Sequence, residues 1–432
     1  MDLDRLFHQI LKPALGCTEP VAVALASAAA RMSASGWVPG APVPQLELEP
    51  EPYLVHAEMS RSVFKNGFAI ALPNADGHKG LHMAAALGLH CDPDKGLRLF
   101  EDVTPEQIRT AESMVRSGLV QIDVVENVPE VHIYVEVHCG AHRGAALIRG
   151  EHANIACLWR DGKVCYGSAE ELPAGRNLGP IDALKDLNFA QVVALVENLP
   201  PSVIELLRVT VKKNVDACES GLERPMGVGA GYFGDDASIV RHVSSLAAAG
   251  SDARMSGHPV EVMTSAGSGN QGVTATIPIV AYARAHQMDE MPMLKAVALS
   301  HLVTMYLTCY LGYLSALCGV AIKAGTGAAC GLTYLMGGDT AAIERAVKIM
   351  AASLTGMICD GAKAGCALKV STAADMALRA ATLAIREAEV PRDNGIVGGN
   401  ADETIRHLAE LNRSMGKLDE TIVQIMLGKA AL

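Results

Sequence analysis

Residues 130–140 read EVHIYVEVHCG, an alternation of apolar and polar side chains that is typical of a β-strand with one buried face. Similar short runs, separated by turn residues, surround it: LVQIDVVEN (119–127), GAALIRG (144–150), ANIACLWR (153–160) and KVCYGS (163–168). Their regular spacing predicts an antiparallel sheet, with a helix at residues 104–117 packed on one face.

The segments on either side of this sheet region have different patterns. Residues 45–72 contain an alternating run and an apolar run around a Lys-Asn-Gly turn, which favour strands, and residues 76–88 favour a helix. From about residue 180 onward the apolar spacing is helical. We therefore predict an α+β, predominantly helical fold. Its large helical domain comprises residues 1–44 and 185–432, and an α/β insertion at 45–184 contains the antiparallel sheet.

The composition argues against several classes of protein. The chain has 432 residues, of which 50% are apolar, enough for two or three domains. A formal net charge of −11, with no Lys/Arg run, argues against a nucleic-acid partner. Residues 296–322 are long enough to cross a membrane, but they include a histidine and several hydroxyl side chains and lack a basic flank. We expect a buried central helix there and no membrane association.

Eleven cysteines occur in a chain whose first residues, MDLDRLFHQILKPALG, lack the pattern of an export signal. This combination predicts a reducing, cytoplasmic location, where an unpaired cysteine is usually a small buried apolar residue. We therefore expect a functional role only for cysteines with unusual spacing or surroundings.

Cys359 and Cys366 lie in the glycine-broken segment GMICDGAKAGCALKV, residues 356–370. In one continuous helix they would be about 10.5 Å apart along the axis, too far for two ligands of a compact metal centre. A turn at Gly361 and Gly365 would instead let both sulfurs point inward. The spacing is not that of a zinc finger. On the residues alone, core packing and metal binding both stay open.

Two further cysteines have unusual surroundings. Cys318 lies in LSALCGVAIKAGTGAACG (314–331), where the lack of bulky side chains indicates either tight helix packing or a backbone that approaches a ligand closely. Cys17 directly precedes a helix with Pro20 in its first turn. The helix dipole and free N–H groups predict a lowered pKa for a thiol at this position; an ordinary helix cap with a buried thiol is the alternative.

The segment TSAGSGNQG, residues 264–272, precedes an apolar helix and is rich in glycine and serine. Backbone N–H groups in such a loop form a nest for a carboxylate or phosphate, and a flexible turn is the alternative. The candidate substrate contacts are Ser265, Ser268, Gly269, Asn270 and Gln271. GSGNQG also resembles the phosphate cup of some pyridoxal-phosphate lyases, but the helical C-terminal half fits their α/β fold poorly.

In this order, GCTEP, FKNG, SDAR, GSGNQG, SALCG and GMICDGAKAGC resemble the L-cysteine desulfidase family, which is related to the alpha subunit of iron–sulfur L-serine dehydratase. The resemblance extends over nearly the whole chain. It implies a [4Fe–4S] cluster held by Cys318, Cys359 and Cys366, with Cys17 as the catalytic base. The implied reaction is α,β-elimination of L-cysteine to sulfide, ammonia and pyruvate.

The implied substrate is a small amino acid, which Lys65 and Asn66 would orient. L-cysteine is expected over L-serine, because thiolate is the better leaving group and sulfur the softer ligand for iron. The alternatives are an L-serine dehydratase with the same cluster chemistry, a pyridoxal-phosphate lyase, and a non-enzymatic iron–sulfur or redox sensor. The closer spacing of the last two ligands and the lack of a separate regulatory domain distinguish this chain from serine dehydratases. The oligomeric state stays open, a homodimer being one option.

Overall fold

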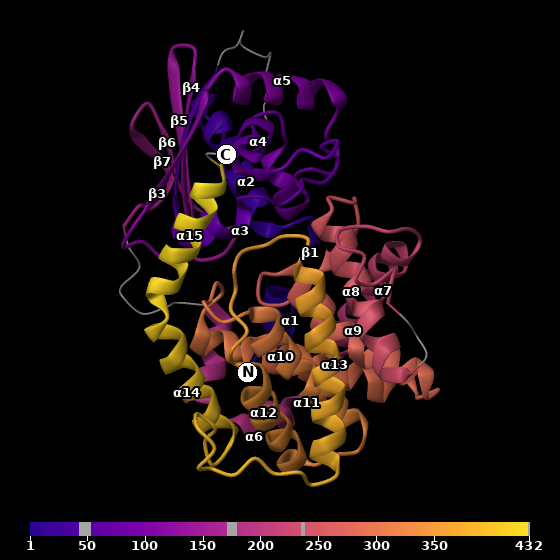
Figure 1. Ribbon diagram of the computed structural model, residues 1–432. Coiled ribbons are helices and arrows are strands. Elements are labelled where there is room, and N and C mark those ends of the chain that lie inside the picture. The colour runs from indigo at the N-terminus through magenta and orange to yellow at the C-terminus, as the bar shows by residue number, and fades with distance from the viewer. Residues whose placement is uncertain (43–52, 171–178, 235–237, 431–432) are drawn as a thin grey trace.

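The computed structural model describes residues 1–42, 53–170, 179–234 and 238–430 and shows a sheet unit next to a helical unit (Figure 1). The structure is 57% helical with 13% strand, which confirms the predicted α+β, predominantly helical class.

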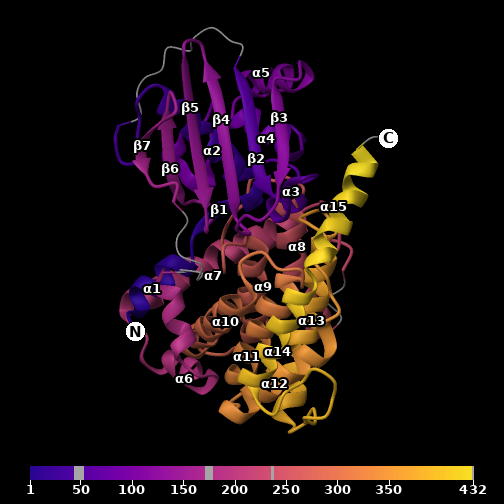
Figure 2. The ribbon, with the colours of Figure 1, turned by 90° about the vertical axis from the view of Figure 1, so that its left-hand side faces the viewer.

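The sheet unit is built on a six-stranded sheet with the order β3-β2-β4-β5-β6-β7 (Figure 2). Its strands are β2 (Leu54–Ser60), β3 (Val120–Val125), β4 (His132–Cys139), β5 (His142–Arg149), β6 (Ile155–Arg160) and β7 (Lys163–Gly167). Neighbouring strands are antiparallel, as predicted, except that β2 and β3 run parallel. A parallel pair needs a long crossover, and the helices between β2 and β3 supply it.

Helices α2 (Thr18–Ala34) and α4 (Gly80–Gly88) pack on this sheet, and α5 (Pro105–Arg116) packs on α4. Every residue of α2 is buried, and the helix packs on β4, β5 and β6. A Cβ at Gly144 of β5 would lie 1.8 Å from the carbonyl oxygen of Ala30, so this close approach requires glycine. Residues 1–44 were predicted to belong to the helical domain, whereas α2 shares the apolar core of the sheet unit.

Helix α3 (Arg61–Gly67) occupies a position for which a strand was expected. The hydroxyl of Ser60 accepts a hydrogen bond from the N–H of Val63, which caps the helix and ends β2. The prediction of an apolar strand run around a Lys-Asn-Gly turn at residues 65–67 is therefore wrong, since the helix includes these residues and its cap outweighs the local apolar pattern. Residues 45–52 of the expected strand region lie outside the described residues.

The helical unit contains most of the remaining chain (Figure 1). Its α-helices are α1 (Leu3–Ile10), α6 (Phe189–Ala194), α7 (Pro201–Leu222), α8 (Ile239–Met255), α9 (Gly269–Ala285), α10 (Glu290–Leu311), α11 (Thr326–Leu335), α12 (Thr340–Leu354), α13 (Cys366–Ile385), α14 (Ala401–Ser414) and α15 (Gly416–Ala430). Shorter elements are η1 (Pro93–Arg98) of the sheet unit, η2 (Gly179–Asp186), η3 (Leu195–Asn198), the π-helix η4 (Val320–Gly325), and the paired strands β1 (Pro13–Leu15) and β8 (Glu261–Met263).

Helix α10 lies at the centre of the helical unit. In the described part of the chain it is the one helix with the length and hydropathy of a membrane span, but 89% of its apolar window is buried inside the protein. This burial confirms the predicted central helix, although the helix ends at Leu311, where Gly312 adopts a φ of +89°. The turn that follows leads to Cys318.

Helix α15 extends from the helical unit towards the sheet unit (Figures 1 and 2). It packs on α3 of the sheet unit and on α14 of the helical unit. The C-terminal helix therefore joins the two units at the side where α3 lies.

Candidate active site

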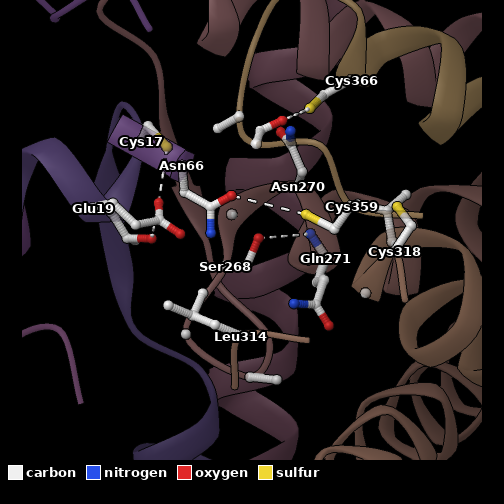
Figure 3. A pocket seen from close by; sticks show the side chains of 18 of the residues that line it. Cys17, Glu19, Asn66, Ser268, Asn270, Gln271, Leu314, Cys318, Cys359 and Cys366 are labelled. Atoms are coloured by element: carbon white, nitrogen blue, oxygen red, sulfur yellow. Dashed lines mark hydrogen bonds between the residues drawn. The ribbon is translucent and has the colours of Figure 1, made fainter. Parts of the chain in front are cut away.

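A cavity of about 90 Å³ lies between the two units (Figure 3). A cavity needs about 10–15 Å³ on this scale for one water, so this one has room for a small molecule. The sheet unit contributes Cys17, Glu19, Asn66 and His152 to its wall. The helical unit contributes the loop before α9, the turn after α10 and the segment before α13.

Cys318, Cys359 and Cys366 all line this cavity. A short antiparallel bridge brings the first two segments together. In it the N–H of Cys318 donates to the carbonyl oxygen of Met357 at 2.8 Å, and that of Cys359 to Ala316 at 2.7 Å. Cys366 is the first residue of α13. The fold thus gathers at one site the three thiols that the family resemblance implies as ligands.

The electrostatic surroundings of these thiols suit a cationic ligand. Burial, followed by the negative charge of the neighbouring Cys359, raises the pKa of Cys318 to about 11. Lys369 acts in the opposite direction; its Nζ donates to the carbonyl oxygen of Ile358 at 2.8 Å and contacts the Asp360 carboxylate. A thiol that holds its proton this firmly loses it when a metal ion binds, because the charge of the metal stabilises the thiolate.

The donor set fits an iron–sulfur cluster better than a single metal ion. Within the described residues, no three His, Cys, Asp or Glu side chains are close enough to hold one ion. In a cluster each cysteine thiolate binds a different iron, so the ligands surround a larger group. Cys318, Cys359 and Cys366 around one cavity match that arrangement.

Cys17 is the N-cap residue of α2, and its Sγ donates to Oε2 of Glu19 at 3.0 Å. Burial, followed by the negative charge of Glu19, raises the pKa of Cys17 well above its ordinary value. The expected lowering of this pKa by the helix dipole is therefore wrong, because exclusion of water outweighs the helix N-terminus. The thiol is a hydrogen-bond donor that faces the same cavity as the other three (Figure 3).

Three buried polar atoms of the cavity wall have no hydrogen-bond partner in the described part of the chain: Nε2 of His152, Nε of Arg254 and Oε1 of Gln271. The His152 nitrogen lies 3.9 Å from Oε1 of Glu19, beyond hydrogen-bond distance. An unsatisfied buried group costs about 1–3 kcal/mol, so their convergence indicates a polar ligand. Donors together with an acceptor suit the carboxylate and ammonium groups of an amino acid.

Arg254 also holds the loop that precedes α9. Its guanidinium is buried and donates to the carbonyl oxygen of Gly16 and to Oδ1 of Asn270. A Cβ at Gly269 would lie 2.3 Å from Cζ of Arg254, so glycine is required for the arginine to lie there. Ser268 caps α9 through a hydrogen bond from the N–H of Gln271. The N-terminus of α9 therefore opens onto the cavity, as an anion nest would require.

The predicted substrate-binding residues fall into two groups. Asn66, Ser268, Gly269, Asn270 and Gln271 line the cavity, whereas Lys65 and Ser265 do not. The hydroxyl of Ser265 lies 2.9 Å from Nδ1 of the buried His301. Nζ of Lys65 instead donates to the carbonyl oxygen of Cys359. Both side chains therefore lie outside the cavity and contact residues next to it, and neither is placed to contact a substrate.

Four residues of the cavity wall were not predicted as site residues from the sequence: Glu19, His152, Arg254 and Lys369. Glu19 and Arg254 stand inside the GCTEP and SDAR motifs, and Lys369 lies in the stretch that carries Cys359, so a signal for these three was available. His152 lies in the turn between β5 and β6 and reaches the cavity through the packing of the two units. No sequence motif around His152 indicates that it belongs to the site.

A family model described as "Serine dehydratase alpha chain" matches residues 94–424, most of the sequence. The chain belongs to this family. A "UPF0597 protein" of Nitratidesulfovibrio vulgaris (strain DP4) is 35% identical over 99% of both chains. One from Clostridioides difficile (strain 630) is 37% identical over 96% of this chain and 97% of that one.

Membership of the serine dehydratase alpha chain family relates this protein to lyases of the dehydratase type. The matched region contains the three clustered cysteines and all the cavity residues of the helical unit, while Cys17 and Asn66 lie before it. The part of the site that the family model covers is thus the part that contains Cys318, Cys359 and Cys366.

Proposed function

We propose that this protein is an L-cysteine desulfidase, which eliminates sulfide from L-cysteine with the help of a [4Fe–4S] cluster. The observation that carries the proposal is the convergence of Cys318, Cys359 and Cys366 with Cys17 on one cavity. Family membership supports a dehydratase-type lyase, and loss of hydrogen sulfide from cysteine is the same type of elimination as loss of water from serine.

Cys318, Cys359 and Cys366 would hold the cluster as thiolates. When bound through three cysteines, a [4Fe–4S] cluster has one iron without a protein ligand, which supplies a Lewis acid to the substrate. Lys369 interacts electrostatically with Cys318 and Cys359, and Arg254 with Cys366. These two cations offset negative charge on the ligands.

The substrate would bind through the polar atoms that have no partner within the protein. Arg254 and the N-terminus of α9 attract the carboxylate, while Oε1 of Gln271 accepts a hydrogen bond from the ammonium group. Nε2 of His152 offers one more contact from the opposite side of the cavity. Such fixed contacts orient the Cα–H bond and the β-sulfur for elimination.

Cys17 and Glu19 would together accept the Cα proton. The thiol of Cys17 already donates its proton to the Glu19 carboxylate, so Cys17 can take the proton from Cα while passing its own to Glu19. The Cα–H electron pair forms the Cα–Cβ double bond, and the Cβ–S bond breaks with the release of sulfide. The resulting aminoacrylate hydrolyses in water to pyruvate and ammonia.

Anaerobic reconstitution with iron and sulfide tests this proposal. Cys318→Ser, Cys359→Ser and Cys366→Ser should each lose both bound iron and sulfide release from L-cysteine. Cys330→Ser is the matched control, because Cys330 is a fully buried thiol of α11 that does not line the cavity. Iron binding that survives in all three variants would overturn the assignment.

L-serine dehydratase is the second candidate, favoured by the description of the matching family model. The two activities share every role described above and differ in the leaving atom, so a comparison of the substrates distinguishes them. An iron-loaded protein without lyase activity would instead indicate a sensor. A yellow protein activated by pyridoxal phosphate would indicate the corresponding class of lyase.

A further inference from the structure

Lys65 is a buried lysine that faces away from the cavity. Its side chain is 2% exposed, and Nζ lies 2.6 Å from Oδ1 of Asp419. The same ammonium group donates to the backbone carbonyl oxygen of Cys359 at 3.0 Å. A lysine is buried to this extent only when its charge is paired, and here the pair includes the backbone of a cysteine at the site.

The segment that carries Cys359 is docked on the helices that carry this ion pair. Gly361 has a φ of +90°, and a Cβ there would lie 2.3 Å from the carbonyl oxygen of Lys65 and 3.0 Å from the end of the Met426 side chain. Asp419 also accepts a hydrogen bond from the hydroxyl of Ser62 at 3.3 Å. Helices α3 and α15 therefore form the surface against which this segment is held.

We propose that Lys65 is a positioning residue, which together with Asp419 fixes the Cys359 segment so that its thiol faces the cavity. The inference rests on the proposed function in taking Cys359 as a cluster ligand. It assigns a role in assembly of the site to the C-terminal helix, since Asp419 belongs to α15. Four segments distant in sequence thereby meet at one point: α3, the Cys318 turn, the Cys359 segment and α15.

The bridge between Cys318 and Cys359 makes this role measurable without a cluster. The N–H of Cys359 donates to Ala316 and that of Cys318 donates to Met357. If Lys65 holds the carbonyl oxygen of Cys359, loss of the ammonium group frees the segment and exposes these two amides to exchange. A hydrogen bond to a charged group is strong enough for its loss to raise local exchange on the order of tenfold.

The experiment measures hydrogen–deuterium exchange by residue in the iron-free, reduced protein and then iron uptake after anaerobic reconstitution. The variants are Lys65→Met, which keeps the length of the side chain, Asp419→Asn, and Lys65→Arg as the conservative replacement. Lys348→Met is the matched control, because Lys348 is 6% exposed and pairs with Glu389 but does not line the cavity.

We expect Lys65→Met and Asp419→Asn to accelerate exchange at residues 316–318 and 357–361 and to reduce iron uptake. Lys65→Arg should restore both at least in part, and Lys348→Met should leave exchange in these segments unchanged. Unchanged exchange there in Lys65→Met, or an equal acceleration throughout the chain, would overturn the positioning role. Failure of the wild-type protein to take up iron, with local exchange still faster in Lys65→Met, would overturn the proposed function and leave the positioning role standing.

Discussion

Cys17 shows that burial can override the effect of a helix N-terminus. Its position as the N-cap of α2 would normally favour a thiolate. The thiol is enclosed, however, and it donates to the carboxylate of Glu19, so its pKa is raised. A buried thiol beside a carboxylate is protonated at rest and suited to pass a proton along.

The first prediction concerns Cys17→Ser. A serine hydroxyl keeps nearly the same shape and can donate to Glu19, but it is a far weaker acid than a thiol and passes its proton to Glu19 less readily, so turnover should fall by about 10²- to 10⁴-fold. Iron content should stay at the wild-type level. The measurement is iron per chain together with sulfide release from L-cysteine, and loss of iron in step with activity would make Cys17 a ligand.

The second prediction concerns His301, which lies behind the loop that precedes α9. Its nitrogens lie 2.9 Å from the hydroxyl of Ser265 and 3.1 Å from that of Thr276, and burial lowers its pKa to about 3. An unfolded histidine has a pKa of about 6.5, so only the unfolded chain gains this proton as the pH falls from about 6.5 to about 3.

Neutral His301 therefore stabilises the fold fully above pH 6.5, and this contribution falls at lower pH by up to about 1.4 kcal/mol per pH unit. His301→Gln lacks this titration. The stability difference between wild type and variant, measured by urea unfolding between pH 7.5 and pH 5, should shrink as the pH falls. A constant difference across this range would contradict the assignment.

At the scale of elements, the sequence predicted best where the local signals agree. Residues 104–117 were expected to form a helix, and α5 begins at Pro105 with a capping box between Thr104 and Gln107. The sheet strands after residue 119 follow from their alternation and turns. Helix α3 and the parallel pairing of β2 with β3 depend on a cap and on long-range packing, which a local apolar pattern does not contain.

The stretch from residue 314 to 331 has two parts with different surroundings. Its first part, including Cys318, lies at the cavity and leads into the π-helix η4, a feature often found at functional sites. Its second part is tightly packed, since a Cβ at Gly327 would lie 2.3 Å from the carbonyl oxygen of Ser300 in α10. Close helix packing therefore accounts for the small side chains of the second part, while the first part forms a section of the cavity wall.

The third prediction follows from this packing. Gly327→Val should destabilise the protein by about 1–3 kcal/mol or more, because the added methyl groups force α11 away from α10. Gly416→Ala is the control, since no atom lies within 4 Å of a Cβ at Gly416. The free energy of unfolding in urea is the measurement. Equal stability of the two variants would show that the helices are not in close contact.

At the scale of the whole molecule, the site exists because two units pack against each other. Cys318, Cys359 and Cys366, together with the α9 loop, come from the helical unit, while Cys17, Asn66 and His152 come from the sheet unit. The family resemblance could point to the cysteines, because they stand in short motifs. His152 could not be found in this way, since it reaches the site only through the relative placement of the units.

The fourth prediction tests this contribution of the sheet unit. His152→Ala should lower kcat/KM for L-cysteine by about 10- to 100-fold, the effect of losing one buried hydrogen bond to a polar ligand. Iron content should not change. His138→Ala, an exposed position on β4, is the control. Unchanged kinetics for His152→Ala would place the substrate elsewhere in the cavity.

The most direct test of the central claim is kcat/KM for L-cysteine and for L-serine on the same anaerobically reconstituted protein, with pyruvate followed for both and sulfide for cysteine. A difference of one atom in a pocket gives about 10- to 200-fold discrimination. We predict equal amounts of sulfide and pyruvate from L-cysteine and a preference for it within that range. A ratio in favour of L-serine would contradict the desulfidase assignment, and the absence of pyruvate from both substrates would contradict elimination at this site.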